Sequence, residues 1–304
     1  MYDEMIEWIP FNRLSNIKKI GKGGFGTVFS ATWLDGIRTT VKDSKKEEYT
    51  KSRETSSTVA LKTLSNSQDL SSSDFLQQFK NHMRCKLECG ELDIYGLTQC
   101  TENQEHLKDG DYLMVFEFAD YGDLSSYLQK NFKKLMWEHK LLRLIEISCD
   151  LAKVHKTGYI HRDFHSGNIL LSKIGVMKAD VISYISDLGL SEKFGEYLSK
   201  GEVVGVLPYV APEILSDEYK IHTPEVDIYG LGVIMVEMST GKKPFDGDKY
   251  DTKLAVKICK GLRPECSPGT PDCYIELANK CMQKDPQKRP TANMNTFRML
   301  KKLI

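Results

Sequence analysis

The order in which strand-like and helix-like patterns follow one another is the feature that most constrains the fold of this chain. Strand patterns dominate the first 118 residues, and patterns with a helical period dominate the remainder. The predicted strands are 17–30, which forms a hairpin, 59–64, 94–99 and 112–118. The predicted helices are 74–87, a long buried helix that includes 141–154, 224–239, 252–260, 271–282 and 291–300. Strands followed by helices indicate an α+β fold whose two parts meet near residues 119–122.

The composition is that of a globular protein without a strong bulk charge. Of 304 residues, 40% are hydrophobic, and 42 basic residues balance 42 acidic ones, which argues against a nucleic-acid partner. No apolar run approaches the roughly 20 residues of a membrane span. The first residues lack the layout of a secretory signal, so we expect a cytoplasmic or nuclear protein. The eight cysteines are scattered, which predicts buried thiols rather than a metal–thiolate site.

One segment of the first part is unusually polar. Between residues 39 and 58, nearly every side chain is charged or carries a hydroxyl, and Val41 and Tyr49 are the sizeable apolar exceptions. Such a segment buries too little apolar surface to offset the entropy of ordering it. We therefore expect 39–58 to be a flexible, exposed insertion.

Five short motifs carry the chemistry of the chain. They are the glycine-rich run Gly21-Lys22-Gly23-Gly24-Phe25-Gly26-Thr27-Val28, Val59-Ala60-Leu61-Lys62, His161-Arg162-Asp163 leading to Asn168, Asp187-Leu188-Gly189, and Ala211-Pro212-Glu213. Glycines allow backbone N–H groups to approach phosphate oxygens closely, and carboxylates retain a divalent metal. The glycine run alone is a weak signal, but five motifs in this order point to phosphoryl transfer.

With these motifs, the chain resembles a eukaryotic protein kinase domain, nearest the tyrosine-kinase-like branch. The resemblance extends from about Ile17 to Leu300 and implies a two-lobed fold over residues 14–304. The small N-lobe, 14–118, would be mostly antiparallel β-sheet with one main helix, 119–122 would be the hinge, and 123–304 would form the larger helical C-lobe. The implied cofactors are ATP and Mg²⁺, and the implied partner is a protein substrate.

The resemblance also implies a role for each matching residue. Gly21, Lys22, Gly23, Gly24, Phe25 and Gly26 would cover the ATP phosphates, and Lys62 would contact the α- and β-phosphates. Asp163 would orient the attacking hydroxyl, and Asn168 and Asp187 would hold Mg²⁺. The residues around the adenine would be Val28, Ala60, Leu170, Glu117 and Ala119. Two further matches imply fold-holding roles: Asp227 would brace the catalytic loop, and Arg289 would pair with Glu213 in the helical lobe.

Two departures from the family pattern concern catalysis. The helix 74–87 should supply a glutamate to Lys62, but that position holds Gln78, which lacks the negative charge of a glutamate. His165 stands where serine/threonine kinases usually have a lysine, and Gly167 stands where tyrosine kinases have an arginine. Family analogy still favours serine or threonine over tyrosine as the acceptor.

Three readings of function remain open on these residues. The first is a protein kinase. The second is a pseudokinase, an ATP-binding signalling scaffold with weak or no catalysis, which Gln78 and His165 favour and the intact Lys62, Asp163, Asn168 and Asp187 oppose. The third is a small-molecule kinase, against which Ala211-Pro212-Glu213 argues. Arg162 further suggests regulation by an upstream kinase, with Ser191, Tyr197 and Ser199 as candidate phosphorylation sites.

Overall fold

The computed structural model divides into two compact units, residues 1–86 with 92–118 and residues 87–91 with 119–304. It describes residues 6–23, 26–42, 49–63, 79–80, 83, 93–173, 181–188, 191–194, 205–216 and 222–292. Within that part of the chain, the predicted succession of strands and then helices is confirmed, and the fold is α+β. Each unit is described by itself below.

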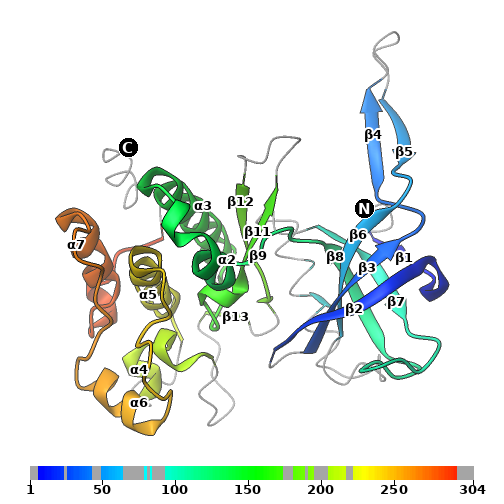
Figure 1. The fold of residues 1–304 in the computed structure, drawn as a ribbon. Helices are drawn as coiled ribbons and strands as arrows, with labels where there is room; N and C mark the ends of the chain where they lie inside the picture. Colours follow the sequence, from blue (N-terminus) through cyan, green and yellow to red (C-terminus); the bar gives the residue numbers. More distant parts are fainter. Residues whose placement is uncertain are drawn as a thin grey trace. The chain divides into compact units, whose positions relative to one another are not determined.

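Unit 1 is built on one twisted, mostly antiparallel sheet (Figure 1). Its strand order is β1-β7-β8-β6-β3-β2, and the single parallel pair is β1 with β7. The strands are β1 (Glu7–Trp8), β2 (Leu14–Gly23), β3 (Gly26–Trp33), β6 (Ser57–Thr63), β7 (Ile94–Gln99) and β8 (Tyr112–Glu117), and the 3₁₀ helix η1 (Phe11–Arg13) precedes β2.

Alternation of side chains along the central strands gives this sheet two different faces. Phe29, Ala31 and Trp33 of β3 are buried in the core of unit 1, together with Val59 and Leu61 of β6. Successive side chains of a strand point to opposite faces, so the intervening residues of β3 and β6 lie on the other face. Val28 of β3 and Ala60 and Lys62 of β6 are among these intervening residues.

The polar segment forms a second, two-stranded sheet. Strands β4 (Arg38–Lys42) and β5 (Tyr49–Arg53) pair in antiparallel register and project from unit 1 as a hairpin (Figure 1). Residues 50–56 are exposed, as the polar composition predicts. That composition does not predict the strand pair, because ladder hydrogen bonds use backbone groups and need no apolar side chains.

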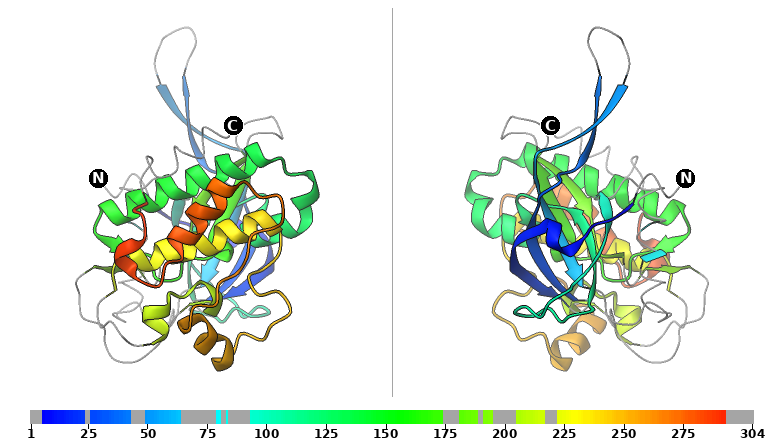
Figure 2. Two further views of the ribbon diagram at one scale, coloured as in Figure 1. Left: turned by 90° about the vertical axis from the view of Figure 1, so that its left-hand side faces the viewer. Right: turned by 90° about the vertical axis from the view of Figure 1, so that its right-hand side faces the viewer.

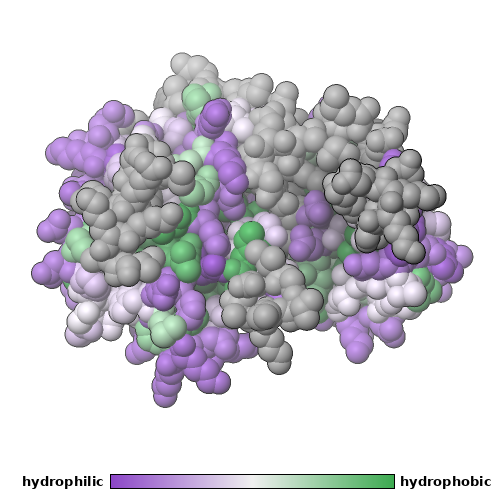
Figure 3. Space-filling view, turned by 90° about the horizontal axis from the view of Figure 1, so that it is seen from above, coloured by the Kyte–Doolittle hydropathy of each residue, from purple (hydrophilic) through white to green (hydrophobic). Residues whose placement is uncertain are grey.

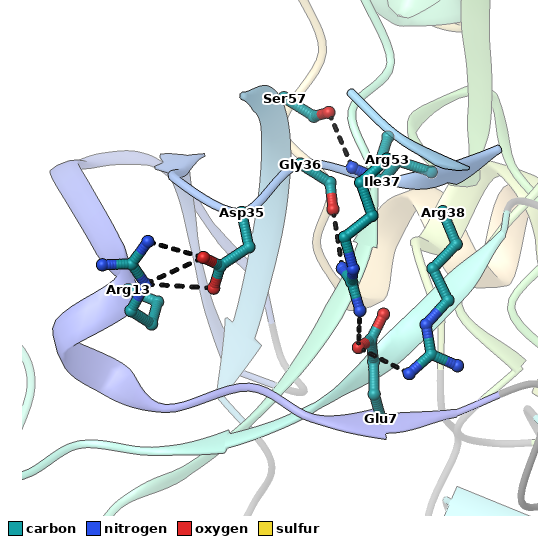
Figure 4. A network of polar contacts seen from close by, with 8 residues as sticks. All are labelled: Glu7, Arg13, Asp35, Gly36, Ile37, Arg38, Arg53 and Ser57. Atoms are coloured by element: carbon teal, nitrogen blue, oxygen red, sulfur yellow. Dashed lines mark hydrogen bonds and ion pairs between the residues drawn. The ribbon is translucent and has the colours of Figure 1, made fainter. Parts of the chain in front are cut away.

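Polar contacts fix the base of this hairpin to its surroundings (Figure 4). The Glu7 carboxylate of β1 accepts hydrogen bonds from Arg38, at 3.0 Å, and from Arg53. Arg53 also donates to the carbonyl oxygen of Gly36 at 2.9 Å, and its guanidinium lies over the Trp33 ring. One carboxylate therefore joins both hairpin strands to the N-terminal edge of the main sheet.

Unit 2 is mainly helical. Its helices are α2 (Leu124–Asn131), α3 (Trp137–Lys156), α4 (Pro212–Leu215), α5 (Glu225–Thr240), α6 (Thr252–Cys259) and α7 (Asp272–Cys281), with the 3₁₀ helices η2 (Phe132–Lys134), η3 (Ser166–Asn168), η5 (Leu207–Tyr209) and η6 (Pro286–Lys288). Its strands are β9 (Gly122–Asp123), β10 (Tyr159–Ile160), β11 (Ile169–Lys173), β12 (Val181–Ile185) and β13 (Glu192–Lys193). Helices α3, α5 and α7 lie side by side in this unit (Figure 2).

Helix α5 is the centre of the helical core. It is apolar on nearly all sides and its residues from Asp227 to Ser239 are buried, as expected for a helix surrounded by other elements. It ends at Gly241, whose φ of 69° and close approach to the Phe132 ring both require glycine. In α3, the predicted burial holds for Leu141, Leu144 and Leu151, but Leu142 is 37% exposed on the outer side of the helix.

Hydrophilic side chains predominate among the described residues on the face shown in Figure 3, and the hydrophobic areas between them are small. No helix within the described ranges combines the length and the apolarity that a membrane crossing needs. Of the predicted helix 74–87, Phe79–Lys80 and Met83 are helical, and the other positions lie outside the described residues. Most of the predicted helix 291–300 also lies outside them.

Candidate functional site

The loop that carries Asp163 is held by a buried carboxylate of α5. Asp227 accepts hydrogen bonds from the backbone N–H groups of His161, at 2.8 Å, and Arg162, at 2.9 Å. It also contacts Nε2 of His155 in α3 at 2.8 Å. Burial by itself raises the pKa of Asp227, but these hydrogen bonds and the neighbouring imidazoles outweigh it and lower the pKa. The predicted bracing role of Asp227 is therefore confirmed.

Asp163 lies at the centre of the loop, and its side chain is 9% exposed. The side-chain amide of Asn168 donates to the Asp163 carbonyl oxygen at 2.9 Å and to its Oδ2 at 3.2 Å. On the other side, Nε2 of His165 lies 3.4 Å from Oδ1. Burial raises the pKa of Asp163. The contact with His165 and the proximity of His161 lower the pKa by more than burial raises it, so the net pKa lies below its usual value. Asp163 is accordingly ionised at neutral pH.

The pairing of β11 with β12 brings Asn168 and Asp187 to the same end of a strand pair. Ile169 is opposite Ile185, so the residue before β11 and the residues after β12 are neighbours. Ser186 secures this end, because its N–H and its hydroxyl both donate to the carbonyl oxygen of Asn168, at 2.8 and 2.9 Å. The carbonyl of Ser186 in turn contacts Nε2 of His161 at 2.9 Å.

The donor set at this end of the strand pair fits Mg²⁺. Mg²⁺ prefers oxygen ligands and is usually held by one or two protein carboxylates or amides together with water and phosphate oxygens. Because the amide nitrogen of Asn168 is directed to Asp163, the amide oxygen is left as an acceptor on the opposite side. The Asp187 carboxylate is close enough to raise the pKa of Asp163 by charge repulsion. Asn168 and Asp187 could thus hold the metal next to Asp163.

The glycine-rich run is the turn between β2 and β3 in unit 1. Gly21, Lys22 and Gly23 belong to β2, Gly26 begins β3, and Gly24 and Phe25 lie outside the described residues. A Cβ at Gly26 would lie 2.2 Å from the carbonyl oxygen of Thr63, so this position requires glycine. The Thr63 hydroxyl also accepts a hydrogen bond from Thr27 N–H at 2.8 Å. These contacts fix the turn against the end of β6.

Three residues expected to contact ATP share one face of the unit 1 sheet. Val28 of β3 is directly opposite Lys62 of β6, and Ala60 is two residues before Lys62. Cross-strand partners and residues two apart point to the same face, and this face is opposite to the one formed by Phe29 and Leu61. The structure therefore brings Val28, Ala60 and Lys62 together.

The remaining expected adenine contacts are divided between the units. Glu117 ends β8 in unit 1, and its N–H donates to the Asp93 carbonyl at 2.7 Å. Leu170 lies in β11 of unit 2, opposite Asp123 and Tyr184. Ala119 also belongs to unit 2, where its carbonyl accepts a hydrogen bond from Gly122 N–H at 3.1 Å.

The predicted ion pair of the helical unit is present. Arg289 donates two hydrogen bonds to the Glu213 carboxylate, at 2.6 and 2.7 Å, and the exposed fractions of the two side chains are 0% and 4%. Among the candidate phosphorylation sites, Ser191 is 4% exposed, which argues against it as an accessible acceptor in this structure. Gln78, Tyr197 and Ser199 lie outside the described residues.

Sequence reasoning missed four residues that shape the site. Ser186 and His155 act through the hydrogen bonds given above, and Thr63 fixes the glycine-rich turn. Gly205, with a φ of 116°, lies so close to the loop that a Cβ there would be 3.3 Å from Asp163 Oδ1. Ser186 precedes Asp187 directly, so its position was readable from the sequence, whereas the contacts of the other three depend on tertiary packing.

Comparisons with known proteins agree with this architecture. The family model described as "Protein tyrosine and serine/threonine kinase" matches residues 14–299. The chain is 30% identical over 298 residues to the probable serine/threonine-protein kinase pats1 of Dictyostelium discoideum, covering 96% of this chain and 8% of that protein. It is 33% identical over 193 residues to the protein kinase kin1 of Schizosaccharomyces pombe, covering 63% of this chain and 20% of that protein.

A third relative is a tyrosine kinase. The tyrosine-protein kinase transforming protein ros of UR2 avian sarcoma virus is 29% identical over 303 residues, covering 95% of this chain and 68% of that protein. The chain thus spans a small fraction of the first two relatives and about two thirds of the third. With the family model matching almost its whole length, the chain belongs to the protein tyrosine and serine/threonine kinase family.

Proposed function

We propose that the chain is a protein kinase that transfers the γ-phosphate of ATP to a protein hydroxyl in a Mg²⁺-dependent reaction. The observation that carries this proposal is the state of Asp163: its carboxylate is ionised, held by Asn168 on one side and next to His165 on the other. An ionised carboxylate held in this way can accept the hydrogen of a substrate hydroxyl and direct the oxygen towards the phosphate.

The chain's other groups have separate tasks in this proposal. Asn168 and Asp187 would hold Mg²⁺, which neutralises the charge that develops on the phosphate oxygens. Lys62 would contact the α- and β-phosphates, while the backbone of Gly21–Gly26 would cover them. Val28, Ala60 and Leu170 would enclose the adenine, with the backbone of Glu117 and Ala119 at its polar edge. Residues 14–118 would act as the N-lobe, 119–122 as the hinge and 123–304 as the C-lobe.

Serine or threonine is the favoured acceptor. Of eight relatives compared, six are named probable serine/threonine-protein kinases, whereas ros is named a tyrosine-protein kinase. An upstream kinase that modifies the segment between Asp187 and Glu213 would be the regulatory partner. Phosphoamino-acid analysis of a labelled protein acceptor identifies the acceptor residue. Phosphotyrosine as the main product would contradict serine or threonine as the acceptor.

The competing function is an ATP-binding scaffold without useful turnover. It is favoured by Gln78, which stands at the sequence position where the family pattern has the glutamate that pairs with the lysine. Both functions include binding of Mg-ATP, so binding does not separate them. Turnover that depends on Asp163 does.

The test is transfer of labelled γ-phosphate to a generic protein acceptor by the purified chain and by Asp163→Asn. We expect the variant to lose about 10²- to 10⁴-fold in rate, because an amide cannot act as the base. Asp109→Asn is the matched control, since Asp109 is an exposed residue of unit 1. Equal rates for the wild type and Asp163→Asn would reject the proposed function and leave the scaffold.

A further inference from the structure

The ring of His165 is the least expected feature of the loop that carries Asp163. It is the residue before η3, and its Nδ1 accepts a hydrogen bond from the backbone N–H of Gly167 at 3.0 Å. Its exposed fraction is 16%, and the ring packs against Tyr209 with 5.7 Å between ring centroids. The ring is therefore fixed by both a polar and an aromatic contact.

The contact with Gly167 decides which nitrogen of His165 carries the proton. A backbone N–H is a donor only, so Nδ1 must offer a lone pair to accept from it. The neutral imidazole then carries its proton on Nε2, the nitrogen that lies 3.4 Å from Asp163 Oδ1. That distance is longer than an ordinary hydrogen bond, and such contacts often shorten only when substrate binds.

Gly167 is required by the same ring. A Cβ built on Gly167 would lie 2.8 Å from Cε1 and 2.9 Å from Nδ1 of His165, and these are the only atoms of the described residues beyond its chain neighbours that it would meet within 4 Å. The backbone of Gly167 does not have the positive φ that would by itself demand glycine. The absence of a side chain at 167 thus leaves room for the ring of His165.

We propose that His165 is a positioning residue for Asp163: the Gly167 N–H holds the imidazole as the Nε2–H tautomer, and the Nε2 proton holds Oδ1 of Asp163 while Asn168 holds Oδ2. In this arrangement His165 is a neutral donor to the carboxylate. It does not take the part of a cation that neutralises the transferred phosphate. The kinetic part of this inference rests on the proposed kinase function.

The first test reads the tautomer directly and needs no turnover. Long-range ¹H–¹⁵N correlation spectra of the full chain labelled with ¹⁵N-histidine, recorded at pH 8, distinguish a protonated Nε2 from a protonated Nδ1. The His165 signals are assigned by their loss in His165→Gln. We expect protonation at Nε2 only. Protonation at Nδ1 would overturn the inference.

The second test separates the two contacts of the ring by substitution. In His165→Asn the amide oxygen can replace Nδ1 and accept from Gly167, but the side chain is too short to reach Asp163. In His165→Gln the amide nitrogen can reach Asp163, but the contact with Gly167 is lost. We expect kcat to fall about 10- to 100-fold in His165→Asn, with the KM for ATP unchanged, and to be largely restored in His165→Gln. Equal kcat values for the two variants would refute the positioning role.

The third test is a double-mutant cycle between His165 and Gly167. We expect Gly167→Ala to lower kcat in the wild type, because its Cβ displaces the ring, and to cause no further loss in the His165→Ala background. Losses that simply add would contradict the inference. The tautomer measurement stays decisive if Gly167→Ala does not fold.

The outcomes also separate this inference from the proposed function. An Nε2–H tautomer in a protein without Asp163-dependent transfer would reject the kinase function but support the inferred tautomer of His165. Active transfer with a protonated Nδ1 would reject the role of His165 alone.

Discussion

His222 is expected to make the stability of unit 2 depend on pH. The residue is 9% exposed, and its Nδ1 has no hydrogen-bond partner among the described residues. Arg162 and Asp227 are the charged groups that line the same small cavity. Burial, with a smaller contribution from the positive charge of Arg162, lowers the pKa of His222 from 6.5 to about 4, although Asp227 acts in the opposite direction.

The sign and size of the effect follow from proton linkage. Between pH 6.5 and about 4, the unfolded chain binds a proton at His222 and the folded chain does not. Acidification therefore favours unfolding in this window. Linkage gives a loss of about 2 kcal/mol in the free energy of unfolding between pH 7.5 and pH 5.0 from this residue alone.

The measurement is urea-induced unfolding of the wild type and of His222→Gln at both pH values, followed by circular dichroism. Helices α2 to α7 all belong to unit 2, so the signal reports mainly on the unit that contains His222. We expect the loss of stability on acidification to be about 2 kcal/mol smaller in His222→Gln. His139→Gln is the control, since His139 is exposed on α3.

Two results would refute this reasoning. The first is an equal loss of stability for the wild type and His222→Gln, which would mean that the imidazole is not kept neutral by burial. The second is a larger loss in the variant, which would reverse the sign of the linkage.

Three further changes test other parts of the structure. Asp227→Asn should lower the free energy of unfolding by about 2–4 kcal/mol in urea titrations, because the amide nitrogen would face a backbone N–H donor or His155; no change would contradict its bracing role. Glu213→Gln should lower the free energy of unfolding by about 3–5 kcal/mol, because the Arg289 charge would stay buried without its partner; a loss below 1 kcal/mol would contradict this. Gln78→Glu, which restores the glutamate of the family pattern, should raise kcat about tenfold, and an unchanged or lower kcat would show that Gln78 does not limit catalysis.

The sequence predicted most of the elements that position the site. Strand patterns located the β2–β3 hairpin and β6, and the glycine-rich run correctly predicted a turn between two strands. Helical periodicity located α3 and α5 to within a few residues. These patterns succeed because burial on one face of a strand, or around a helix, leaves a regular trace in the sequence.

The features that the sequence did not predict depend on contacts between residues far apart in the chain, which leave no local sequence pattern. The β4–β5 hairpin is held by backbone pairing and by Glu7, which lies more than 30 residues before β4. The burial of Ser191 and the lowered pKa of His222 are likewise consequences of tertiary packing. Motif matching named Asp163 and Asn168, but the contact of His165 with Asp163 is visible only when the ring is placed.

The most direct test asks whether Asp187 binds the metal while Asp163 acts in phosphate transfer. Electron paramagnetic resonance of Mn²⁺, titrated with the chain and a non-hydrolysable ATP analogue, measures metal binding without turnover. We predict that Asp187→Asn loses binding of the metal–nucleotide complex and that Asp163→Asn retains it while losing phosphate transfer. Binding that survives in Asp187→Asn, or that is lost in Asp163→Asn instead, would contradict the assignment of metal and base on which the account depends.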